Sequence, residues 1–149
     1  MQLQRRPAEG LPILERGIEI YSHHLANVPE DINTAFNLAI IRVWTSDCRR
    51  DLHDLKGALA ESKMAAELWD RLLVLRPGTF RYLHQKADNL NTMGNLLALN
   101  GDVEGARECF RTGLEIAEQL PKQDTSFNPQ VVIDELRESE KKLNQSHAR

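Results

Sequence analysis

Apolar residues recur every three or four positions along most of the 149-residue chain, and the alternation typical of strands is hard to find. This spacing places apolar side chains on one face of an α-helix. Aromatic residues make up only 5% of the chain, which suits thin helical layers better than a β-sandwich. The sequence therefore predicts an all-α fold, and the chain length alone predicts one domain.

Proline, glycine and asparagine or aspartate residues divide this pattern into helices. Arg76-Pro77-Gly78 ends one helix because proline cannot continue it and glycine tolerates the turn. Asn100-Gly101 suits a left-handed residue that closes a helix hairpin. Residues 45–51 are polar and are interpreted as a helix end and a loop, so the register between Trp44 and Asp54 stays open. The six predicted helices span approximately residues 12–27, 32–44, 54–75, 79–99, 103–120 and 129–149.

One pair of these helices carries small and aromatic residues at the spacing of a known repeat. Gly94 lies in the first helix, Ala106 starts the second, and Phe110 follows one turn later. This unit resembles the tetratricopeptide repeat family, whose helices approach closely at those small residues. The segment 54–58 (Asp-Leu-Lys-Gly-Ala) repeats the pattern of segment 102–106 (Asp-Val-Glu-Gly-Ala).

Weaker copies flank this unit. Gly17, Tyr21 and Pro29 match the second helix of a preceding repeat. The middle unit is several residues too long, and Ser62 stands where an aromatic residue is usual. Long helices of this kind resemble the arrays of kinesin light chains. The resemblance implies a right-handed solenoid over residues 12–120, preceded by a linker or tail at 1–11. A linker at 121–128 and a solvating C-terminal helix at 129–149 would follow.

In such arrays the first helix of each pair lines a concave groove, which implies that this chain binds a peptide or a partner helix. Asparagine can both donate to and accept from the backbone of an extended peptide, although polar residues are also tolerated on any exposed face. The candidate groove residues are Asn33, Asn37, Asp88, Asn91, Thr92 and Asn95. The two tryptophans, Trp44 and Trp69, are expected to pack between helices.

The resemblance therefore predicts a protein–protein interaction module with a scaffold role. Similar arrays occur in bacterial signalling proteins, including serine/threonine kinases, so the chain is also interpreted as a non-catalytic segment of such a protein. The alternative is a self-association module, in which the first helix, lacking the partner helix of its own repeat, forms a homodimer through Tyr21.

No residue pattern indicates catalysis, a cofactor or a metal. His23 and His24 are adjacent, so on a helix they point about 100° apart and do not share a metal in the usual way. Cys48 lies beside Asp47, Arg49 and Arg50, and the two cations would lower the pKa of its thiol. A loop cysteine without a role is the main interpretation, and a reactive thiol is the alternative.

The net charge and the hydropathy of the chain exclude further classes of partner. The formal net charge is −3 and the pI is near 6.0, so no overall positive field attracts nucleic acid or anionic lipid. No apolar run approaches the roughly 20 residues that a membrane helix needs. Two distant cysteines do not form a disulfide framework. We therefore expect a cytoplasmic protein without a membrane span.

Overall fold

The computed structural model describes residues 6–122 and 128–147, and these contain six α-helices and no strand. The all-α prediction is confirmed. The helices are α1 (Pro7–Asn27), α2 (Ile32–Asp51), α3 (Leu55–Leu75), α4 (Phe80–Leu99), α5 (Val103–Glu118) and α6 (Pro129–His147). Most of the linker expected at 121–128, and residues 1–5 of the expected N-terminal tail, lie outside the described residues.

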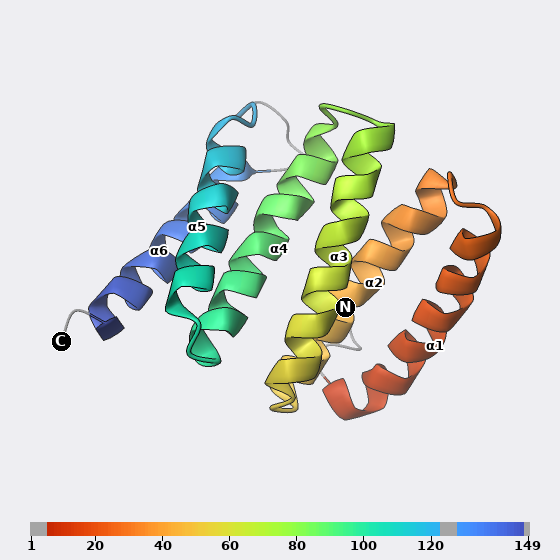
Figure 1. Ribbon diagram of the computed structural model, residues 1–149, viewed down its shortest axis with the longest axis horizontal. Helices are drawn as coiled ribbons and strands as arrows, with labels where there is room; N and C mark the ends of the chain where they lie inside the picture. Colours follow the sequence, from red (N-terminus) through yellow and green to blue (C-terminus); the bar gives the residue numbers. More distant parts are fainter. Residues whose placement is uncertain (1–5, 123–127, 148–149) are drawn as a thin grey trace. The chain divides into compact units, whose positions relative to one another are not determined.

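Contacts between helices divide the chain into two compact units, Met1–Pro77 and Gly78–Arg149, where the length alone predicted one domain. The first unit contains α1, α2 and α3, and α2 packs against both of the others. The second contains α4, α5 and α6, and each of these helices packs against the other two. Within each unit consecutive helices run antiparallel (Figure 1).

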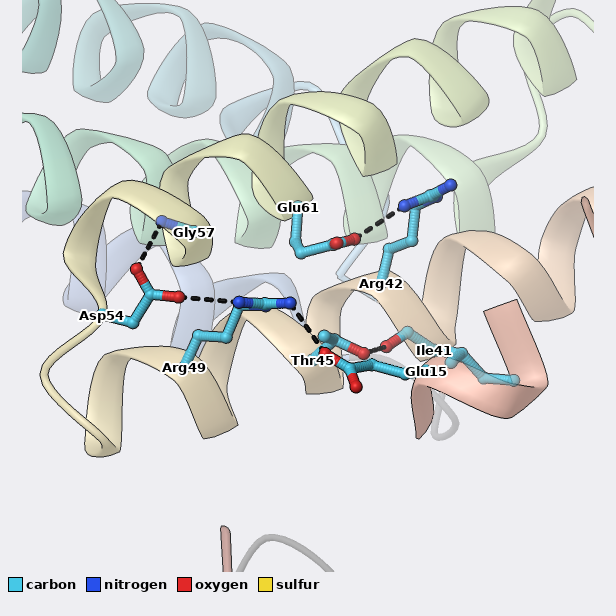
Figure 2. Close-up of polar contacts among 8 residues, drawn as sticks. All are labelled: Glu15, Ile41, Arg42, Thr45, Arg49, Asp54, Gly57 and Glu61. Carbon is cyan, nitrogen blue, oxygen red and sulfur yellow. Dashed lines mark hydrogen bonds and ion pairs between the residues drawn. The ribbon is translucent and has the colours of Figure 1, made fainter. Parts of the chain in front are cut away.

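Two helix boundaries differ from the prediction by more than a helical turn. Helix α1 begins at Pro7 rather than Pro12, because a proline is well tolerated in the first helical turn. Helix α2 continues to Asp51 instead of ending near Trp44. Its polar residues are accommodated because the Thr45 hydroxyl donates to the Ile41 carbonyl at 2.8 Å (Figure 2). The buried Ser46 hydroxyl donates to the Ala58 carbonyl of α3, also at 2.8 Å.

The core of the first unit forms where α2 meets its two neighbours. Trp69 of α3 is fully buried, and the ring of Phe36 from α2 meets it edge to face at 5.6 Å between centroids. The packing role expected for Trp69 is therefore confirmed. On the other side of α2, a Cβ atom on Gly17 would lie 3.3 Å from Cδ1 of Ile41, so α1 approaches α2 closely there.

Arginines of α2 add ionic contacts to this apolar packing. The Arg49 guanidinium donates to Asp54 at 2.7 Å and to Glu15 of α1 at 2.8 Å (Figure 2). Arg42 donates to Glu61 of α3 at 2.7 Å, and both side chains are largely buried, with exposures of 14% and 15%. Arg49 thus connects all three segments of the unit at one point.

Aspartates cap three of the helices. The Asp54 carboxylate accepts from the Gly57 amide and the Asp102 carboxylate from the Gly105 amide, each at 2.9 Å. The two similar five-residue segments therefore start α3 and α5 in the same way. The amide of Gly57 and the guanidinium of Arg49 lower the pKa of the Asp54 carboxyl.

The second unit is built around Phe110 and Leu136, both fully buried. A Cβ atom on Gly94 of α4 would lie 2.4 Å from Cε1 of Phe110, so only glycine fits against that ring. Leu136 of α6 packs against Gly113 of α5, where a Cβ atom would lie 2.9 Å from Cδ2. The turn between α4 and α5 contains Gly101 at φ 85°, the left-handed conformation that the sequence predicted.

Candidate interaction surfaces

The six candidate groove residues fall into two sets, one in each unit. Asn33 and Asn37 lie in the first two turns of α2 in the first unit and are both exposed. Asp88, Asn91 and Thr92 lie on α4 in the second unit and are half-buried, and Asn95 on the same helix is exposed.

Asn95 differs from the other candidates because it links two helices. Its side-chain amide donates to the Asn91 carbonyl one turn earlier at 3.0 Å and to the hydroxyl of Ser139 on α6 at 3.1 Å. The last helix therefore contributes to the same face of the unit as α4. Sequence analysis assigned α6 only a solvating role and missed this contribution.

A cavity of about 350 Å³ lies beside Asn95, between the last turns of α4 and α6. Its apolar lining comes from all three helices of the unit, and Leu99 at 63% exposure is its most accessible apolar side chain. The lining residues are Asn95, Ala98, Leu99, Phe110, Ser139, Lys142, Leu143, Ser146 and His147. On α6 the polar residues at positions 139, 142 and 146 recur at helical spacing and share one face. The sequence could not identify this face as part of a cavity, because the spacing does not show which helix lies opposite.

The polar groups around the cavity are partly engaged. The Ser146 hydroxyl donates to the Lys142 carbonyl at 2.9 Å, and Nδ1 of His147 donates to the Leu143 carbonyl at 2.9 Å. The Lys142 ammonium lies 3.8 Å from the Glu138 carboxylate, and both side chains are more than half exposed. An exposed pair at that distance is weak, so the lysine remains available to a ligand.

Cys48 lies in helix α2 and not in the loop that was expected, and its surroundings do not favour the reactive-thiol alternative. The side chain is buried inside the extended α2, and burial together with the charges of Asp47 and Asp51 raises the pKa of its thiol. Arg49, one of the two cations expected to lower that pKa, is paired with Glu15 and Asp54.

The other chemical possibilities give no site among the residues the structure describes. No group of three or more histidine, cysteine, aspartate or glutamate side chains there could hold a metal ion. His24 instead contacts the Asp31 carboxylate at 2.9 Å, and His23 lies 3.4 Å from the side chain of Asn27. None of the described helices is both long and apolar enough to span a membrane.

The first helix carries the candidate surface for self-association. Tyr21 is half-buried, and the face that bears Gly17 packs against Ile41 of α2. The large exposed apolar side chains of α1 are instead Ile13 at 59% and Ile20 at 54%, two turns apart on one stripe.

Comparison of the chain with protein-family models, with curated proteins and with solved structures found no match.

Proposed function

We propose that the chain is a tetratricopeptide-like protein-interaction module that holds a peptide or a partner helix against the second unit. The observation that carries this proposal is the cavity beside Asn95, which combines exposed apolar surface with polar groups at its edge. Binding sites for ligands are typically concave and mostly apolar, with a few polar groups that fix orientation. The proposal assigns binding, and no catalysis or cofactor, to the chain.

The packing of α4 against α5 supports the tetratricopeptide part of the proposal. Gly94 and Ala106 occupy the small positions of the family pattern, and both are buried. Phe110 fills the space left by Gly94. The similar caps of α3 and α5 are a second sign that the helix pairs are repeats of one unit.

In the proposed binding mode, a partner places an apolar side chain in the cavity and the polar groups on α4 contact its backbone. Asn91, Thr92 and Asp88 lie on the turns of α4 that precede Asn95, so they extend the contact surface along the helix. The exposed pair Asn33 and Asn37 on α2 is the corresponding proposal for the first unit. A scaffold segment of a larger signalling protein would use such a surface, and we propose that role for the chain.

An affinity capture from the source lysate tests this function. The bait with both Asn37→Ala and Asn95→Ala is compared with the wild-type chain. The control bait is Asn144→Ala, which changes an exposed asparagine of α6 outside the cavity lining. A protein captured by wild type and by the control, and lost by the double variant, supports recognition through these asparagines. Identical captures by all baits would contradict it.

A second candidate function, self-association, is favoured by the exposed stripe on α1. Ile13 and Ile20 would become buried if α1 packed against α1 of a second copy. The test is sedimentation velocity at several concentrations for wild type, for Tyr21→Glu, and for Ile13→Glu with Ile20→Glu. Dimerisation that both variants abolish supports the proposal, and a wild-type chain that stays monomeric at high concentration rejects it.

A further inference from the structure

The hydrogen-bonding groups at the cavity of the second unit differ in how far they are already used. The Ser139 oxygen accepts from Asn95, which leaves the hydroxyl hydrogen without an acceptor among the described residues. Among the described residues, the partner of the Lys142 ammonium is the Glu138 carboxylate at 3.8 Å, and the lysine side chain is 71% exposed. Two donors, the Ser139 hydroxyl and the Lys142 ammonium, therefore remain available to a ligand beside the amide oxygen of Asn95.

The charged groups around the cavity favour a ligand that carries a carboxylate. Among the described residues, the lining includes one ammonium group, Lys142, and one imidazole, His147, and no carboxylate. Glu138 lies one turn before Lys142 but is not part of the lining. A carboxylate on the ligand can therefore replace Glu138 as the partner of Lys142 without meeting a like charge in the lining.

We infer that this cavity binds an acidic–apolar segment of a partner polypeptide, in which a leucine or phenylalanine side chain is flanked by aspartate or glutamate. The apolar side chain lies against Ala98 and Leu99, the accessible apolar side chains of the lining, and the neighbouring carboxylate accepts from Lys142 and Ser139. A cavity of about 350 Å³ has room for one large side chain together with that carboxylate. This inference rests on the proposed function and adds the chemistry of the partner.

Three short peptides, each acetylated and amidated so that no terminal charge contributes, test the inference. The first has the sequence Glu-Glu-Leu-Phe-Glu-Glu, the second replaces the glutamates with lysines, and the third replaces leucine and phenylalanine with serines. Each is titrated into the ¹⁵N-labelled full chain. The first peptide is expected to shift the amide signals of Leu99, Ser139 and Leu143, and the other two are expected to leave them in place.

Charge reversal at Lys142 is the decisive comparison. Lys142→Glu should weaken binding of the glutamate peptide about fivefold, the effect of one exposed charge pair, and should favour the lysine peptide. Lys141→Glu makes the same change of charge at an exposed neighbour outside the cavity lining, and it should leave the affinity close to that of wild type. Ala98→Trp, which fills the cavity, should abolish the shifts while the helical circular dichroism is retained.

Several outcomes would overturn the inference. These are equal weakening by Lys141→Glu and Lys142→Glu, a wild-type preference for the lysine peptide, and shifts produced by decanoate but not by the glutamate peptide. Shifts at Leu99 and Ser139 that grow with the concentration of the chain alone would indicate a second copy as the occupant, which also overturns it. A lysate partner captured equally by wild type and Lys142→Glu would leave the proposed function standing and reject only the acidic–apolar chemistry.

Discussion

At two helix contacts, a single glycine determines how closely the helices can approach. Gly94 and Gly17 both lie where one helix approaches another, but the neighbouring atoms differ. At Gly94 an added Cβ would meet the ring of Phe110 at three atoms, the nearest at 2.4 Å, and the ring is fully buried. At Gly17 it would meet the end of the Ile41 side chain at 3.3 Å, which can move by rotation.

The two glycines therefore respond differently to alanine. Gly94→Ala gains about 1 kcal/mol of helix propensity but overpacks a fixed ring, so we expect a net destabilisation of about 1 to 2 kcal/mol. Gly17→Ala is the matched control, and we expect it to be neutral or to stabilise by up to about 1 kcal/mol. Urea denaturation followed by circular dichroism measures both. Equal effects of the two substitutions would show that Phe110 does not restrict the position.

Cys48 gives a second prediction at this scale. Since its thiol is buried and its pKa is raised, we expect almost no reaction with a thiol reagent at neutral pH in the folded Cys109→Ala variant, which leaves Cys48 as the only cysteine. Labelling should become complete when urea unfolds the chain. Rapid stoichiometric labelling without urea would mean that Cys48 is accessible and would restore the reactive-thiol alternative.

Single residues also mark the limit of the sequence analysis. The small residues at 94 and 106 could be identified because their type and spacing are typical of close helix contacts. The exposure of Ile13 and Leu99 could not be predicted, because an apolar residue at the edge of a helical stripe has the same spacing whether or not a neighbouring helix covers it. The cavity beside Asn95 could therefore not be predicted, because it depends on which apolar side chains stay exposed.

At the scale of helices, composition was misleading where buried polar groups were satisfied by partners distant in sequence. Residues 45–51 of α2 contain a threonine, a serine, two aspartates and two arginines, which reads as a loop. In the structure Ser46 donates to Ala58 of the next helix and Arg49 bonds to both Glu15 and Asp54. Such partners lie on other elements, so periodicity within α2 could not reveal them.

The aspartate cap of α3 makes the stability of the chain depend on pH. The pKa of Asp54 is lowered from 3.8 by the bonds from Gly57 and Arg49, so the ionised carboxyl is favoured in the folded chain. Its contribution to stability is present above pH 3.8 and is lost as the pH falls through the lower pKa of the folded state. Asp54→Asn keeps an acceptor for the cap but removes the titrating group.

We therefore expect Asp54→Asn to be less stable than wild type near neutral pH, and to lose less stability on acidification below about pH 4. Urea denaturation at pH 7 and pH 3 provides the comparison. Asp31 has a similarly lowered pKa at the start of α2, so Asp31→Asn is a parallel case that should behave alike. An unchanged difference between the two pH values in Asp54→Asn would show that this carboxyl does not contribute.

At the scale of the whole molecule, the division into two units was hidden from the sequence. The Arg76-Pro77-Gly78 turn between α3 and α4 has the same composition as an ordinary turn between packed helices, and Gly78 adopts the left-handed conformation expected of it at φ 71°. Only the contacts between helices assign α1–α3 and α4–α6 to separate units. If each unit has its own core, its stability depends mainly on its own residues.

The two tryptophans make this separation measurable. Trp44 and Trp69 both lie in the first unit, so tryptophan fluorescence reports on that unit, whereas circular dichroism reports on both. Leu136→Ala removes a fully buried side chain of α6 and should destabilise the second unit by about 3 kcal/mol. We expect part of the dichroism transition in urea to move to lower concentration while the fluorescence midpoint stays in place.

Val131→Ala, at a position 51% exposed on the same helix, is the control for this comparison. It should change the free energy of unfolding by no more than about 0.5 kcal/mol and leave both midpoints close to those of wild type. If fluorescence and dichroism instead shift together in Leu136→Ala, the six helices unfold as one cooperative array. Each repeat would then depend on its neighbours, as in a continuous solenoid. Ligand binding at the cavity of the second unit would in that case also stabilise the tryptophans of the first, whereas separate units would confine the stabilisation to α4, α5 and α6.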